Sequence, residues 1–291
     1  MKKHLLKIFL IVIIFFLVIF FFTKSVKSFL NTHPAFKIKK IATSHKPYPN
    51  GHRQATGYRL KEEEIKKILN ISEQTSIFSL NLKKASKRLE EKPEIKKAVI
   101  IRRFPDTLII QLKERKPVAQ IGVRRYFLID EEGVILPGPK NFPFANFPLI
   151  EGIDFPLSEP KIGRRYISQN LYSGLSIIKF LSSFGEFTPL EVPATGGAVA
   201  SGDLLLTGFK LKKINVKDVK NILLYLQIDS PDLSAWSGKT VLIKINIPED
   251  NEAKNALKKK IRLLKEILPL HRPQDVKYID LRFKDIMVGR K

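Results

Sequence analysis

The five histidines of the chain are the first candidates for chemistry, because imidazole serves both as an acid–base catalyst and as a metal ligand. No two of them form a His-Glu-x-x-His pair or lie three or four residues apart, the spacing that places two ligands on one face of a helix. His45 and His52 share a polar stretch, where two solvated side chains are a better interpretation than a metal site. We therefore expect no metal ion to be bound; the other histidines are His4, His33 and His271.

Three further stretches imitate functional motifs. Ser237–Thr240 reads Ser-Gly-Lys-Thr, like the end of a phosphate-binding loop, but Leu233 stands where that loop needs its first glycine. Asp130–Glu132 could pair carboxylates, but a predicted hairpin turn favours solvated side chains. Arg102 and Arg103 could contact phosphate, although a solvated basic face is the simpler interpretation. With no Gly-x-Ser-x-Gly motif either, the sequence predicts no catalytic residue and no cofactor.

The composition is strongly basic, with a formal net charge of +24 and a pI near 10.0. Such a surface attracts polyanions, namely nucleic acid, anionic lipid, acidic proteins or anionic cell-wall polymers. Hydrophobic residues make up 44% and charged residues 27%, which favours folded domains over disorder. The absence of cysteine excludes disulfides and thiolate metal sites.

The N-terminal segment indicates the compartment. Leu5 to Phe22 is an apolar run interrupted only by Lys7, and as a helix it spans about 27 Å, close to the thickness of the bilayer hydrocarbon. No Ala-x-Ala cleavage site follows, so we expect an uncleaved single-pass anchor in a bacterial-type inner membrane rather than a signal peptide. The short N-terminal tail is expected in the cytoplasm and the bulk outside it; a soluble nucleic-acid-binding protein does not need this segment. Basic residues beside the anchor can contact anionic lipid: Lys24, Lys27, Lys37, Lys39 and Lys40.

Two groups of elements follow the anchor. The first is a β-α-α-β-β unit, in which Pro93 stops the second helix. Its expected elements are strand Phe36–Ile41, a loop over 43–57, helix Glu62–Leu69, a helix capped by Asn81 and carrying Leu82, Ala85 and Leu89, and strands Ala98–Phe104 and Thr107–Lys113. The second group is rich in strands. Its expected elements are hairpin strands Tyr126–Asp130 and Val134–Leu136, helix Ser168–Phe184, strands Lys213–Val216, Asn221–Gln227 and Thr240–Ile247, helix Asn251–Leu268 and strand Val276–Phe283. The fold class is therefore α+β.

Several short motifs occur in the order found in one protein family. They are Pro93–Val99, Arg102–Leu108 and Glu114–Ala119, then Leu128–Asp130 with Gly133–Val134, then Phe147–Gly152, and finally Tyr278–Phe283. Together with the anchor they resemble the FtsQ/DivIB family of bacterial cell-division proteins, in which a POTRA domain precedes a β domain. The stretches Thr43–Arg59 and Glu186–Lys212 depart from the family pattern, so no functional residue is carried over from them.

The resemblance implies a domain organisation and a role. The expected segments are a cytoplasmic tail (1–4), a transmembrane helix (5–22), a juxtamembrane linker (23–35), a POTRA domain (36–115), an FtsQ-type β domain (116–285) and a C-terminal tail (286–291). The implied role is that of a non-enzymatic divisome scaffold at the division septum, which recruits partners of the FtsB/DivIC and FtsL type and does not bind nucleic acid.

The resemblance also implies a partner-binding site near the C-terminus. Val276–Phe283 is expected to be an edge strand that accepts a partner strand, with Ile279, Leu281 and Phe283 on the face toward the core. A covered, purely structural strand is the alternative. The expected partner-binding residues are Tyr278, Asp280, Arg282, Phe283 and Lys284.

Two other functions stay open at the level of the sequence. A POTRA-bearing outer-membrane assembly or transport factor would be expected to carry tandem POTRA units or a membrane β-barrel, and neither pattern is visible. A membrane-anchored enzyme acting on cell-wall polymer would need a catalytic constellation, and none can be named.

Overall fold

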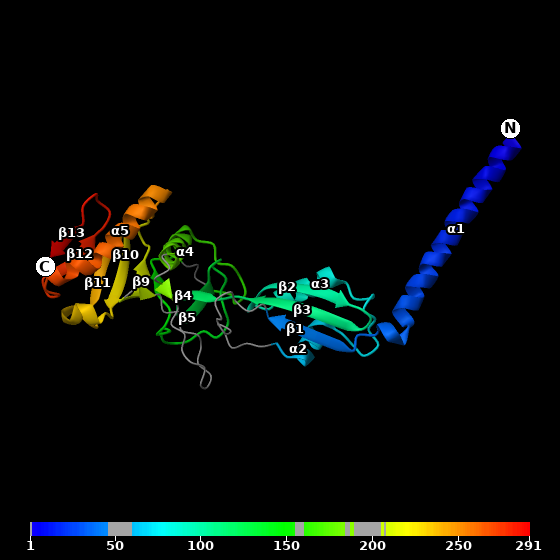
Figure 1. The fold of residues 1–291 in the computed structure, drawn as a ribbon, viewed down its shortest axis with the longest axis horizontal. Coiled ribbons are helices and arrows are strands. Elements are labelled where there is room, and N and C mark those ends of the chain that lie inside the picture. The colour runs from blue at the N-terminus through cyan, green and yellow to red at the C-terminus, as the bar shows by residue number, and fades with distance from the viewer. Residues whose placement is uncertain (1, 46–59, 155–159, 184–186, 189–204, 207) are drawn as a thin grey trace. The chain divides into compact units, whose positions relative to one another are not determined.

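The computed structural model describes residues 2–45, 60–154, 160–183, 187–188, 205–206 and 208–291, which fall into two compact units (Figure 1). Unit 1 contains the described residues up to Glu114, and unit 2 contains those from Arg115 onward. The mixed α+β class expected from the sequence is confirmed, with an apolar N-terminal helix, a small α+β domain and a β-rich C-terminal region.

Helix α1 (Lys2–Thr32) opens unit 1. The segment Leu10–Thr32 is long and apolar enough to cross a membrane, and its apolar side chains are exposed. Residues 23–32, which we expected to form a linker, continue the helix. Thr32 lies in the last turn, where its hydroxyl donates to the carbonyl oxygen of Ser28.

The rest of unit 1 is a three-stranded sheet with two helices. Its elements are the 3-10 turn η1 (Pro34–Phe36), β1 (Lys40–His45), α2 (Glu62–Leu69), α3 (Leu82–Glu90), β2 (Ile95–Arg103) and β3 (Thr107–Glu114). The strand order is β1-β3-β2, with β1 parallel and β2 antiparallel to β3. Burial alternates along β3, where Leu108, Ile110 and Leu112 are buried, as expected for a sheet covered by helices on one face. The predicted β-α-α-β-β order is confirmed.

Local sequence signals set the helix ends of unit 1. Asn81 caps α3 by accepting a hydrogen bond of 3.0 Å from the backbone N–H of Lys84, and α3 ends before Pro93. Helix α2 ends at Asn70, whose φ of 54° lies in the left-handed region. Both predicted helices are therefore confirmed, α2 with the same bounds.

The first strand lies further along the chain than predicted. We expected it at Phe36–Ile41, but β1 spans Lys40–His45. The segment before β1 pairs with the loop that precedes α3: Ile38 N–H donates to Thr75, and Ile77 N–H donates to the carbonyl of Phe36. These backbone groups are therefore used outside the three-stranded sheet.

Unit 2 is built on one long sheet covered by two helices. Its elements are β4 (Pro117–Gly122), β5 (Tyr126–Asp130), β6 (Leu149–Glu151), α4 (Gln169–Ser182), β7 (Phe187–Thr188), β8 (Leu205–Leu206), β9 (Phe209–Asn215), β10 (Ile222–Ile228), η2 (Pro231–Trp236), β11 (Thr240–Ile245), α5 (Asn251–Ile267), η3 (Leu268–Leu270), β12 (Val276–Asp280) and β13 (Met287–Arg290). The main strand order is β13-β12-β11-β10-β9-β6-β4-β5. Residues from α4, α5 and the strands share one apolar core, which contains Leu171, Ile178, Leu257, Ile261 and Ile243.

The helices of unit 2 begin close to their predicted first residues, and each has a side-chain cap. Ser168 caps α4, and Asp250 caps α5 by accepting a hydrogen bond of 2.7 Å from Ala253 N–H. Phe184, the predicted last residue of this helix, lies outside the described residues. The Ser-Gly-Lys-Thr stretch connects η2 to β11, with Gly238 at a φ of 71°.

The environment of Asp130 in the acidic hairpin differs from the one we expected. We expected a solvated carboxylate, but Asp130 is 1% exposed. Its Oδ1 accepts from the N–H groups of Glu132 and Val134, and its Oδ2 lies 2.6 Å from Arg115 Nη1. Burial alone would lower the pKa of Arg115, but the hydrogen bonds from its guanidinium to Asp130 and Glu132 outweigh it and raise that pKa. This carboxylate therefore organises the turn of its hairpin.

The environment of Arg102 also differs from the solvated face that we expected. Its side chain, on β2, is bound to the loop before α3 rather than solvated, because Nε donates to the carbonyl oxygen of Ile77 at 2.7 Å and Nη2 to that of Leu80 at 2.8 Å. A guanidinium that bonds two backbone carbonyls fixes the path of the chain before α3.

Candidate functional site

The expected edge strand lies inside the sheet, so that prediction was wrong. Strand β12 pairs in parallel with β11 on one side, where Ile243 faces Ile279. On its other side it pairs in an antiparallel manner with β13, where Ile279 faces Val288. Residues 286–291 were predicted to be a tail, because four strand residues that include Gly289 carry too little pattern to be recognised.

Strand β13 takes the place at the end of the sheet. Among the described residues it is the last strand of the order, with β12 as its neighbour. A terminal strand presents one row of backbone N–H and C=O groups that no neighbouring strand pairs, and this row can accept a strand from another chain. Met287 and Arg290 on β13 are exposed, while Val288 and Gly289 are half-buried.

Tyr278 and Gly289 hold β12 and β13 together. They are partners in the register, and a Cβ atom added to Gly289 would lie 2.5 Å from the Tyr278 ring. On the same ring, Lys244 Nζ lies 3.5 Å from the centroid, which is a cation–π contact. Tyr278 is therefore packed within unit 2 rather than displayed as expected.

Asp280 is also engaged inside unit 2. Its carboxylate is buried and accepts from Arg282 through Nε at 2.9 Å and Nη2 at 2.6 Å. The third guanidinium nitrogen, Nη1, donates to Asn221 Oδ1 at 3.0 Å. These side-chain hydrogen bonds hold the pKa of Asp280 below its usual value, and the carboxylate raises the pKa of Arg282.

Phe283 lies outside the core, contrary to expectation. The alternation does not continue to Phe283, because β12 ends at Asp280 and the chain bends after the buried Leu281. Lys260 on α5 holds this bend, since its ammonium group donates to the carbonyl oxygens of Leu281 and Phe283. The Phe283 side chain is left 57% exposed.

Exposed apolar and basic side chains lie on β13 and in the segment just before it. We call this surface the C-terminal edge; it consists of Phe283, Lys284, Met287 and Arg290. Phe283 and Met287 are 57% and 55% exposed, and an aromatic or methionine side chain of this kind is a common anchor in protein interfaces. Of the five predicted binding residues, the structure exposes Phe283 and Lys284, and it uses Tyr278, Asp280 and Arg282 to hold unit 2 together. Sequence reasoning missed Met287 and Arg290.

The C-terminal edge suits binding rather than catalysis. It combines a strand edge, two apolar side chains and cationic groups, none of which is a nucleophile or a general acid near neutral pH. In the part of the chain that the structure describes, no group of three or more His, Cys, Asp or Glu side chains is arranged to hold a metal ion.

A comparison with known protein families identifies a domain in unit 1. Residues 58–115 match the family model of the POTRA domain, FtsQ-type. Unit 1 therefore carries an FtsQ-type POTRA domain. The matched residues contain α2, α3, β2 and β3, the elements whose order the sequence had indicated.

Several proteins to which this chain is similar are named cell division proteins. The chain is 34% identical over 96 residues to cell division protein FtsQ of Syntrophotalea carbinolica, and the matched segment covers 33% of this chain and 34% of the relative. It is 45% identical over 74 residues to FtsQ of Rickettsia bellii, with 25% and 27% covered. It is 27% identical over 148 residues to DivIB of Clostridium tetani, with 50% and 52% covered. The similarity to FtsQ and DivIB inferred from the motifs is confirmed, and the matched segments span from about a quarter to about half of these relatives.

Proposed function

We propose that the chain is a membrane-anchored cell-division scaffold of the FtsQ/DivIB type, which recruits and links other division proteins and catalyses no reaction. The observation that carries the proposal is an FtsQ-type POTRA domain in the same compact unit as an apolar helix of membrane-spanning length. The named relatives support the division role.

In this proposal α1 is a retained, single-pass anchor in the inner membrane. The residues before it lie in the cytoplasm, and the POTRA domain and unit 2 lie outside it, at the division septum. The length and apolar composition of α1 support this, as does its continuous helix through Thr32. Protease added to intact spheroplasts should digest the chain beyond about Lys27. Full protection of that part, or a mature N-terminus beyond Phe22, would contradict the topology.

The POTRA domain is proposed to carry recruitment to the division site. The face of its sheet opposite the buried residues exposes Val99 and Ile101, which are 38% and 43% accessible on β2. Apolar side chains on an open sheet face are a natural contact for a partner.

A chimera tests this role of the POTRA domain. Residues 36–115 are exchanged for an unrelated domain of similar size, while α1 and unit 2 are kept. The chimera should stay in the membrane but lose its midcell position, as followed with a fluorescent fusion. Midcell localisation equal to that of the parent would contradict recruitment by the POTRA domain.

The C-terminal edge is proposed to bind a partner of the FtsB/DivIC type, itself held beside FtsL-type proteins. Strand addition at β13 would supply backbone hydrogen bonds, while Phe283 and Met287 would supply apolar contacts and Lys284 a charge. Exposure of these side chains supports the proposal.

A further inference from the structure

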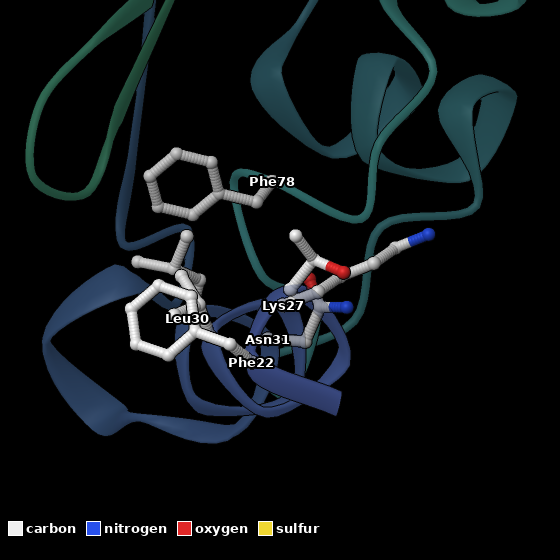
Figure 2. Close-up of a pocket in the computed structure, with 7 residues that line it drawn as sticks. Phe22, Lys27, Leu30, Asn31 and Phe78 are labelled. Atoms are coloured by element: carbon white, nitrogen blue, oxygen red, sulfur yellow. The ribbon is translucent and has the colours of Figure 1, made fainter. Parts of the chain in front are cut away.

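An apolar groove lies between the last turns of α1 and the loop before α3. Its volume is about 310 Å³, and both segments belong to unit 1. Phe22, Val26, Leu30 and Phe78 supply apolar walls, and Lys27 and Asn31 supply polar ones. Figure 2 shows Phe22 and Leu30 on the side of the helix that faces Phe78.

The groove is preformed, because several contacts fix the loop that carries Phe78. The buried Ser76 hydroxyl donates to the carbonyl oxygen of Leu30 at 3.0 Å, a group that has no partner within the last turn of α1. Ser76 Oγ also accepts from Phe78 N–H at 3.2 Å, and Arg102 bonds the backbone of the same loop. The Phe78 ring meets Phe36 at a centroid distance of 5.2 Å.

The groove lies at the height where a membrane surface is expected. From Leu5 to Leu30 the helix rises about 39 Å, close to the roughly 40–45 Å of a bilayer with its headgroups. Phe78 lines the groove with Phe22, so this loop reaches the level where the apolar run of α1 ends. Phe104 stacks on Phe78 at 5.3 Å and is 60% exposed, as suits an aromatic side chain in the headgroup region.

The charged side chain among the residues that line the groove is the cation Lys27. Residues 1–61 contain no aspartate or glutamate, while Lys24 and Lys27 lie on the turns of α1 that form the groove. An ammonium group beside an apolar wall matches a phosphate joined to an acyl chain. A partner helix fits less well, since such contacts favour small residues, and of the α1 residues that line the groove only Thr23 is small.

We propose that this groove binds an anionic phospholipid of the surrounding membrane. Lys27 contacts the phosphate, and the upper acyl chain packs against Phe22, Val26 and Phe78. The bound lipid then ties the POTRA domain to the membrane surface beside its anchor. This inference rests on the membrane anchor of the proposed function.

Photo-crosslinking in native membranes tests the contact. The full-length chain carries p-benzoyl-phenylalanine in place of Phe78, of Phe16 in the apolar run, or of Phe142 in unit 2, and mass spectrometry identifies the adducts. Phe16 and Phe142 are matched controls, because they are 65% and 64% exposed. Lipid adducts are expected at positions 78 and 16 and not at position 142.

Each other pattern of adducts overturns a defined part of the proposal. Lipid adducts at 16 but not at 78 would contradict lipid binding in the groove and would still agree with the membrane anchor. A protein adduct at 78 assigns the groove to a partner helix. Equal lipid adducts at 78 and 142 would show that any exposed position is labelled, which contradicts a specific site. The absence of lipid adducts at 16 would contradict both the membrane anchor and the groove.

Lipid retention tests the role of the ammonium group. The full-length protein is reconstituted with equal amounts of phosphatidylglycerol and phosphatidylcholine, washed with detergent, and the retained lipids are measured. Lys27→Gln should lower the retained ratio of phosphatidylglycerol to phosphatidylcholine by about fivefold. Lys83→Gln, a change at an exposed lysine of α3, should leave the ratio unchanged. An unchanged ratio in Lys27→Gln, or an equal loss in both variants, would overturn the phosphate contact.

Discussion

The Arg282 guanidinium donates two parallel hydrogen bonds to the buried carboxylate of Asp280, from Nε to Oδ1 at 2.9 Å and from Nη2 to Oδ2 at 2.6 Å. Such a forked pair is the strongest geometry available to these two side chains. Asn221 accepts from the remaining nitrogen, so the guanidinium joins the end of β12 to the start of β10. The pair therefore makes Arg282 a part of the fold as well as a neighbour of the C-terminal edge.

The first prediction concerns the stability of this pair. Arg282→Glu leaves Asp280 buried beside a second negative charge, which should lower the free energy of unfolding of unit 2 by about 3 kcal/mol. Lys284→Glu, two residues away and exposed, should change it by less than about 0.5 kcal/mol. Urea titration followed by fluorescence of Trp236, the only tryptophan and 2% exposed, measures both. Equal stability of the two variants would contradict a structural role for Arg282.

The second prediction is a pH dependence from the same carboxylate. The pKa of Asp280 is lower in the folded chain than its ordinary value of 3.8, so the unfolded chain takes up the proton first as the pH falls. Its contribution to stability is complete above about pH 5 and is lost progressively as the pH falls through the lowered pKa.

Asp280→Asn isolates this contribution. The variant should be less stable at pH 7 and should lose less stability than the parent chain between pH 5 and 3. Asp285→Asn, an exposed matched change, should follow the parent curve. Parallel curves for the parent and Asp280→Asn would show that Asp280 does not supply this dependence.

The sequence predicted those elements whose ends carry local signals. Asn81 accepts a hydrogen bond from the first turn of α3 and Pro93 follows its end, so this helix was found near its observed bounds. Helix α5 was found from its apolar stripe, in which Leu257, Ile261 and Leu264 are buried. Strand β13 was missed, because four residues around Gly289 gain strand structure by pairing with β12 rather than from a pattern of their own. Local sequence signals do not show which distant segments of the chain pair with each other.

The candidate site shows the same limit. Alternation along Val276–Phe283 placed Ile279 and Leu281 in the core correctly, but it predicted an outward Asp280 that is in fact buried. Burial of that carboxylate depends on Arg282 bending back over two residues and on Asn221 from another strand. Phe283 was assigned to the core because its alternation was assumed to continue beyond the end of β12.

The third prediction tests the apolar anchors of the C-terminal edge. Phe283→Ser and Met287→Ser should each weaken binding of the partner's extracytoplasmic segment by about tenfold, as truncation of an interface anchor does. Both side chains are more than half exposed, so the thermal midpoint should hardly change. Phe142→Ser removes an equally exposed ring elsewhere in unit 2 and should leave the affinity unchanged. Isothermal titration would contradict the assignment if all three variants bound alike.

The fourth prediction asks whether a partner adds to β13 or replaces it. A side chain at Gly289 would collide with the Tyr278 ring, since its Cβ atom would lie 2.5 Å from Cζ, so Gly289→Val should push β13 away from β12. If the partner strand pairs with β13, this variant should bind the partner at least about tenfold more weakly. Tyr278→Ala in the same chain removes the colliding ring and should restore part of the affinity, which a double-mutant cycle measures.

Hydrogen exchange at the amides of β12 shows whether Gly289→Val has acted as designed. Faster exchange at Asp280, whose partner in the register on β13 is Met287, should accompany the loss of affinity. Faster exchange combined with tighter partner binding would contradict strand addition at β13. That result would mean that the partner takes the position of β13 beside β12, and that the chain's own last strand competes with it.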